Sequence, residues 1–284
     1  MRVLLIRHGE TEHNVARLLA GVTDSQLTNH GVNQTQRLGE HLIKKKQLVF
    51  SQVFSSDLKR AARTAQAVCD VQNTSQADYG KISSIQLPLI REQDFGSFEL
   101  LKWARDDEVR AKGLQPTDID FKPKETKEVM SKRADTFLDD YLLPLLALDE
   151  DGLQNIAVVS HGIFLGTLWK ALVRRFKPSS IKVLPDAVQG GMNKPLEHLP
   201  AWSNTGIVEV EIAATVPAQE VEDEVKKREH SGDKNKLDAT MKVIQINGTE
   251  HLNNLKRTRG GLGSSASDDK QKRLDGFFKK PKTT

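Results

Sequence analysis

The chain has 284 residues, of which 37% are hydrophobic and 28% are charged, and its formal net charge is +4. This composition is ordinary for a protein that folds around a core in water, and the length predicts one large domain with extensions or two small domains. The single cysteine, Cys69, excludes an internal disulfide and gives no indication of secretion. The first apolar run is too short for a signal peptide, and no run is long enough to span a bilayer. We therefore expect a nuclear or cytoplasmic protein with no membrane partner.

The positive charge is concentrated at the C-terminal end of the chain. Residues 256–284 contain nine lysines and arginines against three aspartates, which gives this segment a net charge of +6 and leaves −2 on the rest. The basic isoelectric point therefore belongs to the tail. A folded domain that binds nucleic acid directly is not indicated, because such domains carry a basic patch on their own surface.

Strands and helices alternate in the first part of the chain. Val3–Ile6 is a short, continuous apolar run, typical of a strand that is covered on both faces. A helix is predicted over residues 31–46, with Thr28 as its N-cap. A second strand is predicted at Val53–Phe54. The helix after it has apolar side chains at helical spacing, namely Leu58, Ala61, Ala62, Ala65 and Val68.

The alternation continues in the middle of the chain. A third strand is predicted over residues 85–90, although Pro88 weakens it because proline cannot donate a ladder hydrogen bond. A long amphipathic helix is predicted over residues 125–146, and Pro144 is expected to bend or end it. Ile156–Val159 is a fourth strand. The apolar stripe of the long helix consists of Val129, Met130, Phe137, Leu138, Tyr141 and Leu142.

Two late strands, in the stretches 205–212 and 241–246, are predicted to pair antiparallel at an edge of the sheet. The whole pattern predicts an α/β fold, a three-layer sandwich with a mostly parallel sheet and helices on both faces. We expect a domain over residues 1–255 that contains a charged, flexible insertion at 213–240, followed by a disordered basic tail at 256–284.

Charged and titratable side chains stand where two of the predicted strands end. Arg7 and His8 follow the first strand, and His161 follows the fourth. Ligands of open α/β sheets bind beyond the carboxyl ends of the strands, so we expect both histidines at one site. Each is followed by a glycine, Gly9 or Gly162, which lets the backbone turn and a ligand approach closely.

These residues lie within a series of short motifs: RHGETEHN (7–14), DSQLTNHG (24–31), SSDLKRAARTA (55–65), REQDFGSFE (91–99), VVSHG (158–162) and NGTEHL (247–252). In content and order the series resembles the histidine phosphatase superfamily, whose fold is phosphoglycerate mutase-like. The resemblance covers the predicted domain, 1–255. It implies an enzyme that acts on phosphomonoesters through a phosphohistidine intermediate.

The chemistry of a phosphomonoester asks for these residue types independently. Transfer of a phosphoryl group depends on positioning and charge neutralisation, and guanidinium groups match phosphate in a bidentate way. Arg7 and Arg60 are the candidate ligands, with His161 as a third donor. His8 is the candidate nucleophile, which must be neutral to attack, and nearby guanidinium charges lower the pKa of such a group.

The resemblance implies further roles. Glu92 would give a proton to the leaving alkoxide and later take one from water. Thr11 and Asn14 would orient the pocket or contact phosphate, and Asn204 matches a family position near the second histidine. No cofactor is implied, and no clustered ligand pattern indicates a metal.

The resemblance leaves the reaction open between hydrolysis and a mutase reaction, either of which a cytosolic metabolic enzyme could catalyse. Mutases of this family carry a long insertion after the acid, whereas the segment between Glu92 and His161 is short and mostly one predicted helix, which favours a hydrolase. A departure concerns Leu100, which follows Glu99 where the family often has glycine, so the loop after the acid is in question. A domain that no longer turns over substrate is a further alternative, against which the complete residue set argues. The substrate cannot be read from the sequence.

A second motif lies in the tail. QKRLDGFF, residues 271–278, resembles the peptide that docks on the eukaryotic sliding clamp, proliferating cell nuclear antigen (PCNA). One 3₁₀ turn brings Leu274 and Phe277 to the same side, Phe278 adds a second ring, and Gln271 provides an amide contact at the rim. The motif predicts recruitment to the clamp, and the flanking basic runs are weak signals for the nucleus. A chance match and a tail that folds back on the domain are the alternatives.

Overall fold

A computed structural model describes residues 1–76, 79–102, 117–149, 151–187, 195–199, 201–216, 236–257 and 261–267. The clamp-binding motif predicted at 271–278 lies outside these residues, as does most of the predicted insertion at 213–240.

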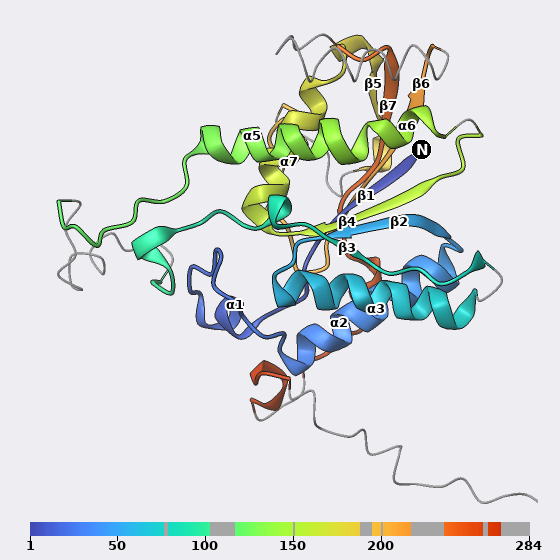
Figure 1. Cartoon of the computed structure of the whole chain (residues 1–284). Helices are drawn as coiled ribbons and strands as arrows, with labels where there is room; N and C mark the ends of the chain where they lie inside the picture. The colour runs from blue at the N-terminus through green and yellow to red at the C-terminus, as the bar shows by residue number, and fades with distance from the viewer. Residues whose placement is uncertain are drawn as a thin grey trace, which may run out of the picture.

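Within the described residues the middle layer is a seven-stranded sheet in the order β3-β2-β4-β1-β6-β7-β5 (Figure 1). Strands β1 to β4 run parallel, β6 is antiparallel to both β1 and β7, and β5 is parallel to β7. The predicted α/β class and the antiparallel pairing of the two late strands are thus confirmed. The pair does not form the edge of the sheet, as predicted, because β5 pairs with the outer side of β7. The strands are β1 (Arg2–Arg7), β2 (Phe50–Ser55), β3 (Ile85–Gln86), β4 (Asn155–Ser160), β5 (Ile181–Val183), β6 (Ile207–Ala214) and β7 (Ala239–Gly248).

Helices cover both faces of the sheet. Figure 1 shows α2 and α3 on one face, with α5 and α7 on the other. No helix in the described ranges combines the length and the apolar character needed to cross a membrane. The helices are α1 (Glu12–Ala16), α2 (Asn29–Glu40), α3 (Lys59–Ser75), α5 (Lys127–Phe137), α6 (Pro144–Ala147) and α7 (Gly162–Arg174).

The central strands are buried on both faces, which explains their continuous apolar runs. In β1, Leu4 and Ile6 belong to the core beneath α2 and α3, whereas Val3 and Leu5 belong to the core beneath α5 and α7. Successive side chains of a strand point to opposite faces, so a run of four apolar residues fills both cores at once.

Two predicted elements differ from the structure because of proline. The third strand ends after Ile85–Gln86, and a 3₁₀ turn, Pro88–Ile90, takes the place of its second half. The predicted helix 125–146 is α5, capped by Thr126, then a π-helical turn, Leu138–Leu142, then α6, which begins at Pro144. Proline fits the first turn of a helix but not its interior, so the chain uses each proline to start an element.

The apolar stripe predicted for the long helix is only partly correct. Val129 is 52% exposed and Tyr141 is 36% exposed, whereas the other four members are buried. Tyr141 lies in the π-helical turn, whose wider spacing interrupts the straight stripe. Val129 lies in α5, where the neighbouring Met130 is the buried residue.

Residues 261–267 pack against the domain although they fall in the tail predicted to be disordered. Their backbone pairs with the start of α2, where Thr28 forms a bridge to Ala266 and the amide of Ser267 donates to the carbonyl of Leu27 at 2.8 Å. Just before them, Arg257 forms an ion pair with Glu10. The packed part of the chain therefore runs past the predicted boundary at residue 255.

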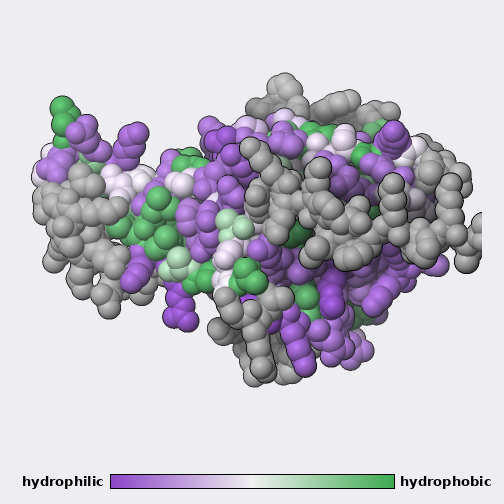
Figure 2. Space-filling model, turned by 90° about the horizontal axis from the view of Figure 1, so that it is seen from below, coloured by the Kyte–Doolittle hydropathy of each residue, from purple (hydrophilic) through white to green (hydrophobic). Residues whose placement is uncertain are grey.

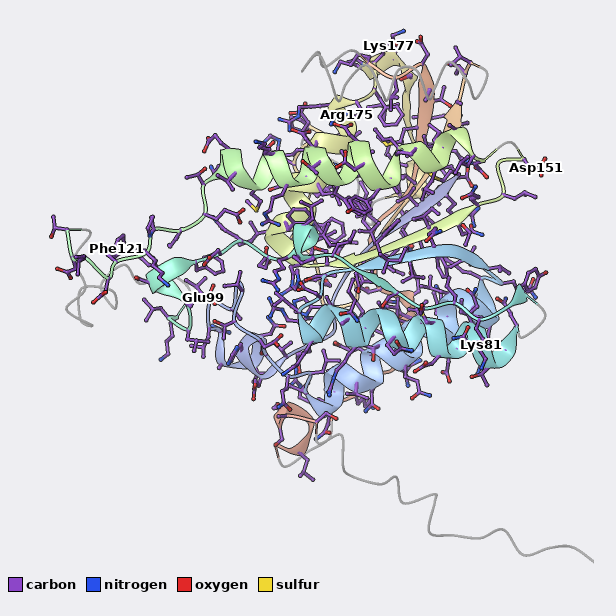
Figure 3. All side chains as sticks on the ribbon, in the orientation of Figure 1. Lys81, Glu99, Phe121, Asp151, Arg175 and Lys177 are labelled. Atoms are coloured by element: carbon purple, nitrogen blue, oxygen red, sulfur yellow. The ribbon has the colours of Figure 1, made fainter. Side chains whose placement is uncertain are left out.

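An arm projects from the body after Glu92. Figure 3 places Glu99 and Phe121 on it, and Phe98 and Phe121 meet edge to face with ring centroids 6.0 Å apart. Hydrophobic residues gather on this side in Figure 2, consistent with the exposure of Leu100 and Ile119. The arm begins directly after the candidate acid, so it frames the site.

Candidate active site

Strand pairing brings the two histidines together. β1 and β4 are parallel neighbours in which Arg7 lies opposite Ser160, so His8 and His161 leave the sheet side by side. Their ring centroids are 5.1 Å apart, and both side chains are buried.

The backbone fixes the tautomer of His8. Its Nδ1 lies 2.7 Å from the carbonyl oxygen of Gly9, so Nδ1–H donates and Nε2 keeps a free lone pair. Burial, and then the charges of Arg60 and Arg7, lower the pKa of His8 well below its ordinary value. The imidazole is therefore held neutral, as a nucleophile must be.

His161 faces the same space as a donor. The Nε–H of Arg60 donates to His161 Nδ1 at 3.1 Å, so the ring proton is on Nε2. Burial, and then the charges of Arg60, His8 and Arg7, lower the pKa of His161 well below its ordinary value. Both His161 Nε2 and Arg7 Nε are buried and have no hydrogen-bond partner in the structure. Orphaned buried donors carry a full desolvation penalty, which a bound acceptor would remove.

Arg60, the second predicted phosphate ligand, lines the pocket but uses most of its donors within the protein. Its NH1 donates to the carbonyl of Thr23 at 2.9 Å, and its NH2 donates to those of Ala20 and Gly21 at 3.1 and 2.6 Å. A guanidinium has five N–H groups. These three contacts and the hydrogen bond to His161 use four of them, so one N–H group remains available. Arg60 thus mainly braces the 20–23 loop and orients His161, while burial lowers its pKa to about 10.

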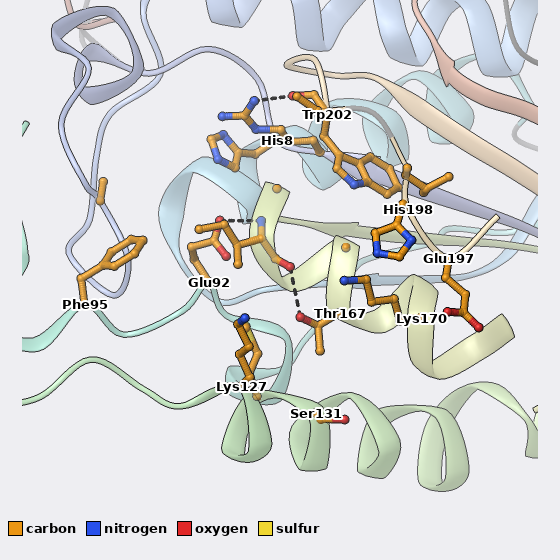
Figure 4. A pocket seen from close by; sticks show the side chains of 18 of the residues that line it. His8, Glu92, Phe95, Lys127, Ser131, Thr167, Lys170, Glu197, His198 and Trp202 are labelled. Carbon is orange, nitrogen blue, oxygen red and sulfur yellow. Dashed lines mark hydrogen bonds between the residues drawn. The ribbon is translucent and has the colours of Figure 1, made fainter. Parts of the chain in front are cut away.

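Glu92 is anchored at the start of α7. Its two carboxylate oxygens accept the backbone N–H groups of Ile163 at 3.1 Å and Phe164 at 2.9 Å. Figure 4 shows Glu92 and His8 lining the same pocket. Sequence reasoning missed Arg133, which donates to the carbonyls of Leu89 and Arg91 and so holds the segment that leads to Glu92. A lone arginine in an amphipathic helix gives no signal of such a role.

Of the other three residues predicted for the site, two line the pocket and one does not. Thr11 and Asn14 line the pocket and form a reciprocal cap at the start of α1. Asn204 is not among the lining residues, because its Nδ2 donates to the carbonyl of His8 and to Asn14 Oδ1, each at 3.1 Å. It supports the backbone of His8, the candidate nucleophile, so it lies beside the first histidine and not the second.

His251, from the NGTEHL motif at 247–252, supports the backbone of His8 through Thr205. His251 Nε2 lies 2.8 Å from the hydroxyl of Thr205, whose amide donates to the carbonyls of Arg7 and His8. Burial, and then the charge of His41, lowers the pKa of His251 to about 4. A neutral His251 therefore locks the turn that holds His8.

The site opens into a pocket of about 1300 Å³. It is lined by residues of the β1–α1 loop, by Glu92 and Phe95, by α5 and α7, and by the 195–202 segment. Within the described ranges, no group of three His, Cys, Asp or Glu side chains is placed to hold a metal ion.

Comparison with known proteins agrees with this geometry. A family model of the histidine phosphatase superfamily (branch 1) matches residues 3–185. The chain belongs to the histidine phosphatase superfamily. Among solved structures it resembles a mycobacterial glucosyl-3-phosphoglycerate phosphatase, with TM-score 0.54 and 19% identity over 87% of this chain and 98% of that one. That likeness concerns the fold.

The relatives that match this chain include proteins named as phosphatases and proteins named as phosphoglycerate mutases. A probable phosphatase of Schizosaccharomyces pombe is 29% identical over 283 residues, which cover 98% of this chain and 79% of that protein. A probable phosphoglycerate mutase of Proteus mirabilis is 34% identical over 182 residues, covering 59% of this chain and 73% of that protein.

The departure at Leu100 does not break the loop. Glu99 accepts backbone hydrogen bonds from Gly21, Val22, Thr23 and Phe95, which tie the arm to the loop that Arg60 braces. Leu100 follows with φ = 63°, in the left-handed region where glycine is preferred. A glycine at this position would adopt the turn without strain, and this chain forms it with a strained leucine.

We expect Leu100→Gly to raise the free energy of unfolding by about 1 kcal/mol, because the left-handed conformation costs a leucine more than a glycine. Leu100 is 42% exposed, so little burial is lost. The matched control is Leu148→Gly, a 63% exposed leucine with φ = −86°, which should destabilise the protein. Urea unfolding measures both, and equal losses in the two variants would contradict the strain.

Proposed function

We propose that the protein is a phosphomonoester hydrolase that works through a phosphohistidine on His8. One observation carries the proposal. The free lone pair of His8 Nε2 shares a buried site with two unpartnered donors, Arg7 Nε and His161 Nε2. An arrangement of this kind fits the equatorial oxygens of a phosphoryl group and holds a nucleophile beside them.

The reaction has two steps. In the first, His8 Nε2 attacks phosphorus, the bond from phosphorus to the ester oxygen breaks, and the carboxyl of Glu92 gives its proton to the leaving alkoxide. In the second, the Glu92 carboxylate takes a proton from water, the oxygen attacks phosphorus, and the P–N bond breaks to release inorganic phosphate. Arg7 and His161 neutralise the charge in both steps.

Hydrolysis is favoured over a mutase reaction by the shape of the site. A mutase must keep water away from its phosphohistidine until a second substrate arrives. Here the pocket is about 1300 Å³, which is more than a small acceptor fills and leaves room for water. The long relative in fission yeast, which matches nearly the whole chain, is also called a probable phosphatase.

Replacement of the nucleophile tests the enzymatic proposal directly. We expect wild-type protein to hydrolyse para-nitrophenyl phosphate and His8→Ala to lose at least about a thousandfold in kcat/KM. His30→Ala, a half-buried histidine outside the pocket, is the control and should keep wild-type activity. Equal rates for wild type and His8→Ala would end the proposal in favour of a domain without turnover.

The ionisation of the two histidines can be measured without substrate. Burial and the neighbouring guanidinium groups lower the pKa of both His8 and His161, so both rings stay neutral on acidification through pH 6.5. In an NMR titration of ring carbons, assigned with His8→Gln and His161→Gln, we expect neither resonance to move between pH 8 and about 6. A midpoint near 6.5 for either ring would contradict a buried, cation-flanked site.

We further propose that the 271–278 peptide recruits the enzyme to the sliding clamp in the nucleus. The support is the sequence motif with its paired rings, Phe277 and Phe278, in an otherwise polar tail. Calorimetric titration of the full chain against PCNA should show binding that the Phe277→Ala/Phe278→Ala variant loses. Equal, weak heats from both proteins would reject recruitment and leave a metabolic enzyme.

A further inference from the structure

The pocket extends well beyond the two histidines along one side of α7. Gly162, Gly166, Lys170 and Arg174 all line it, and they follow one another at intervals of four residues. Residues four apart lie on the same face of a helix. This face of α7 is therefore one wall of a groove that starts at the phosphoryl site.

Helix geometry gives the length of this groove. Gly162 lies beside the orphaned donor, since a Cβ on it would be 3.5 Å from Arg7 Nε. Lys170 is two turns further on, or about 12 Å along the axis. A lysine in a helix extends toward the N-terminal end, so its ammonium group points back along the groove. Figure 4 shows the Lys170 side chain in the same pocket as Glu92 and His8.

The groove is open between these two points. A Cβ added at Gly166 would meet nothing within 4 Å, so the space beside this position of α7 is open. The opposite wall is α5, which contributes Lys127 and Ser131, and the 195–199 segment contributes Glu197 and His198 (Figure 4). The space thus has walls on three sides.

The groove contains more lysine and arginine side chains than carboxylates that are free of a salt bridge. Lys127 and Lys170 are exposed, and neither ammonium group forms a salt bridge within the described part of the chain, although Lys127 interacts through its charge with the adjacent Glu128. The side chain of Arg174 donates a hydrogen bond to the hydroxyl of Ser131 at 3.2 Å. Of the four acidic residues that line the pocket, Glu92 lies at the histidine site and Asp135 forms an ion pair with Arg175 at 3.0 Å, which leaves Glu128 and Glu197.

We propose that this groove binds the second anionic group of a small, elongated phosphomonoester between Lys127 and Lys170. The proposal rests on the proposed function, since the first phosphoryl group occupies the histidine site. The substrate class is a phosphomonoester with a phosphate or carboxylate at its far end. An ammonium group binds either anion as a point charge, and an open path past Gly166 leaves room for the body of the molecule.

Fructose 1,6-bisphosphate and fructose 6-phosphate are matched probes, because they differ in one phosphate group. We expect wild-type protein to prefer the bisphosphate at least about tenfold in kcat/KM at low salt. Lys127→Met and Lys170→Met should each reduce this preference about fivefold, mainly through KM, because they remove binding that is uniform along the reaction. Sodium chloride should weaken the preference in the wild type. Lys182→Met, an exposed lysine on β5, is the control and should retain the full preference.

A steric variant gives a second measurement. Gly166→Leu favours the helical state and fills the middle of the groove, so it should lower kcat/KM for the bisphosphate more than for para-nitrophenyl phosphate. Replacing the probes by a short phosphoserine peptide with a distant glutamate tests a polypeptide in place of a small molecule. Preference for this peptide over the bisphosphate would overturn the substrate class.

Failure of this proposal is distinct from failure of the proposed function. If wild type hydrolyses fructose 6-phosphate but shows no preference for the bisphosphate, or if the Lys127→Met/Lys170→Met variant keeps the preference, the second anion site is wrong and the hydrolase stands. If wild type hydrolyses no phosphomonoester, the hydrolase is wrong. Calorimetric binding of fructose 1,6-bisphosphate to wild type and to the double lysine variant then decides the anion site by itself.

Discussion

The structure depends on keeping two imidazoles and two guanidinium groups out of water at one edge of the sheet. Burial keeps His8 and His161 neutral and makes each unpartnered donor costly, so the site is poised for an anion. The hydrogen bond from Arg60 to His161 is central to this balance. It selects the tautomer of His161. The same guanidinium donates to three backbone carbonyls, which help to stabilise its buried charge.

The rest of the domain holds these groups in place by backbone contacts. Glu99 ties the arm to the loop beneath Arg60, Arg133 holds the segment before Glu92, and His251 locks Thr205 against the carbonyl of His8. None of these three side chains lines the pocket. Packing that is far from substrate therefore decides whether the reactive atoms meet, because a misplacement of about 1 Å is enough to cost much of the rate.

Local sequence signals predicted the elements correctly where the hydrophobic periodicity agreed with the residues that start or end a helix or strand. Four-residue apolar runs gave the buried strands at Val3 and Ile156, and Thr28 gave a helix start, because these signals depend on neighbours in sequence. The same signals failed at Pro88, where the strand stops, and at Val129, which is exposed. They also gave no bounds for α7, whose apolar residues are buried against several elements at once.

The sequence by itself determined the class of fold and which side chains meet at the site, because strand ends with Arg-His-Gly and His-Gly place cationic and titratable groups where open sheets bind ligands. Tertiary structure alone decided how these groups are used. Three N–H groups of Arg60 donate to backbone carbonyls, and Asn204 donates to the carbonyl of His8. Lys170 lines the same pocket as the histidines, on the face of α7 that begins at Gly162. Hydrogen-bond partners and pocket walls come from residues far apart in the chain, and a linear pattern does not specify which of them meet.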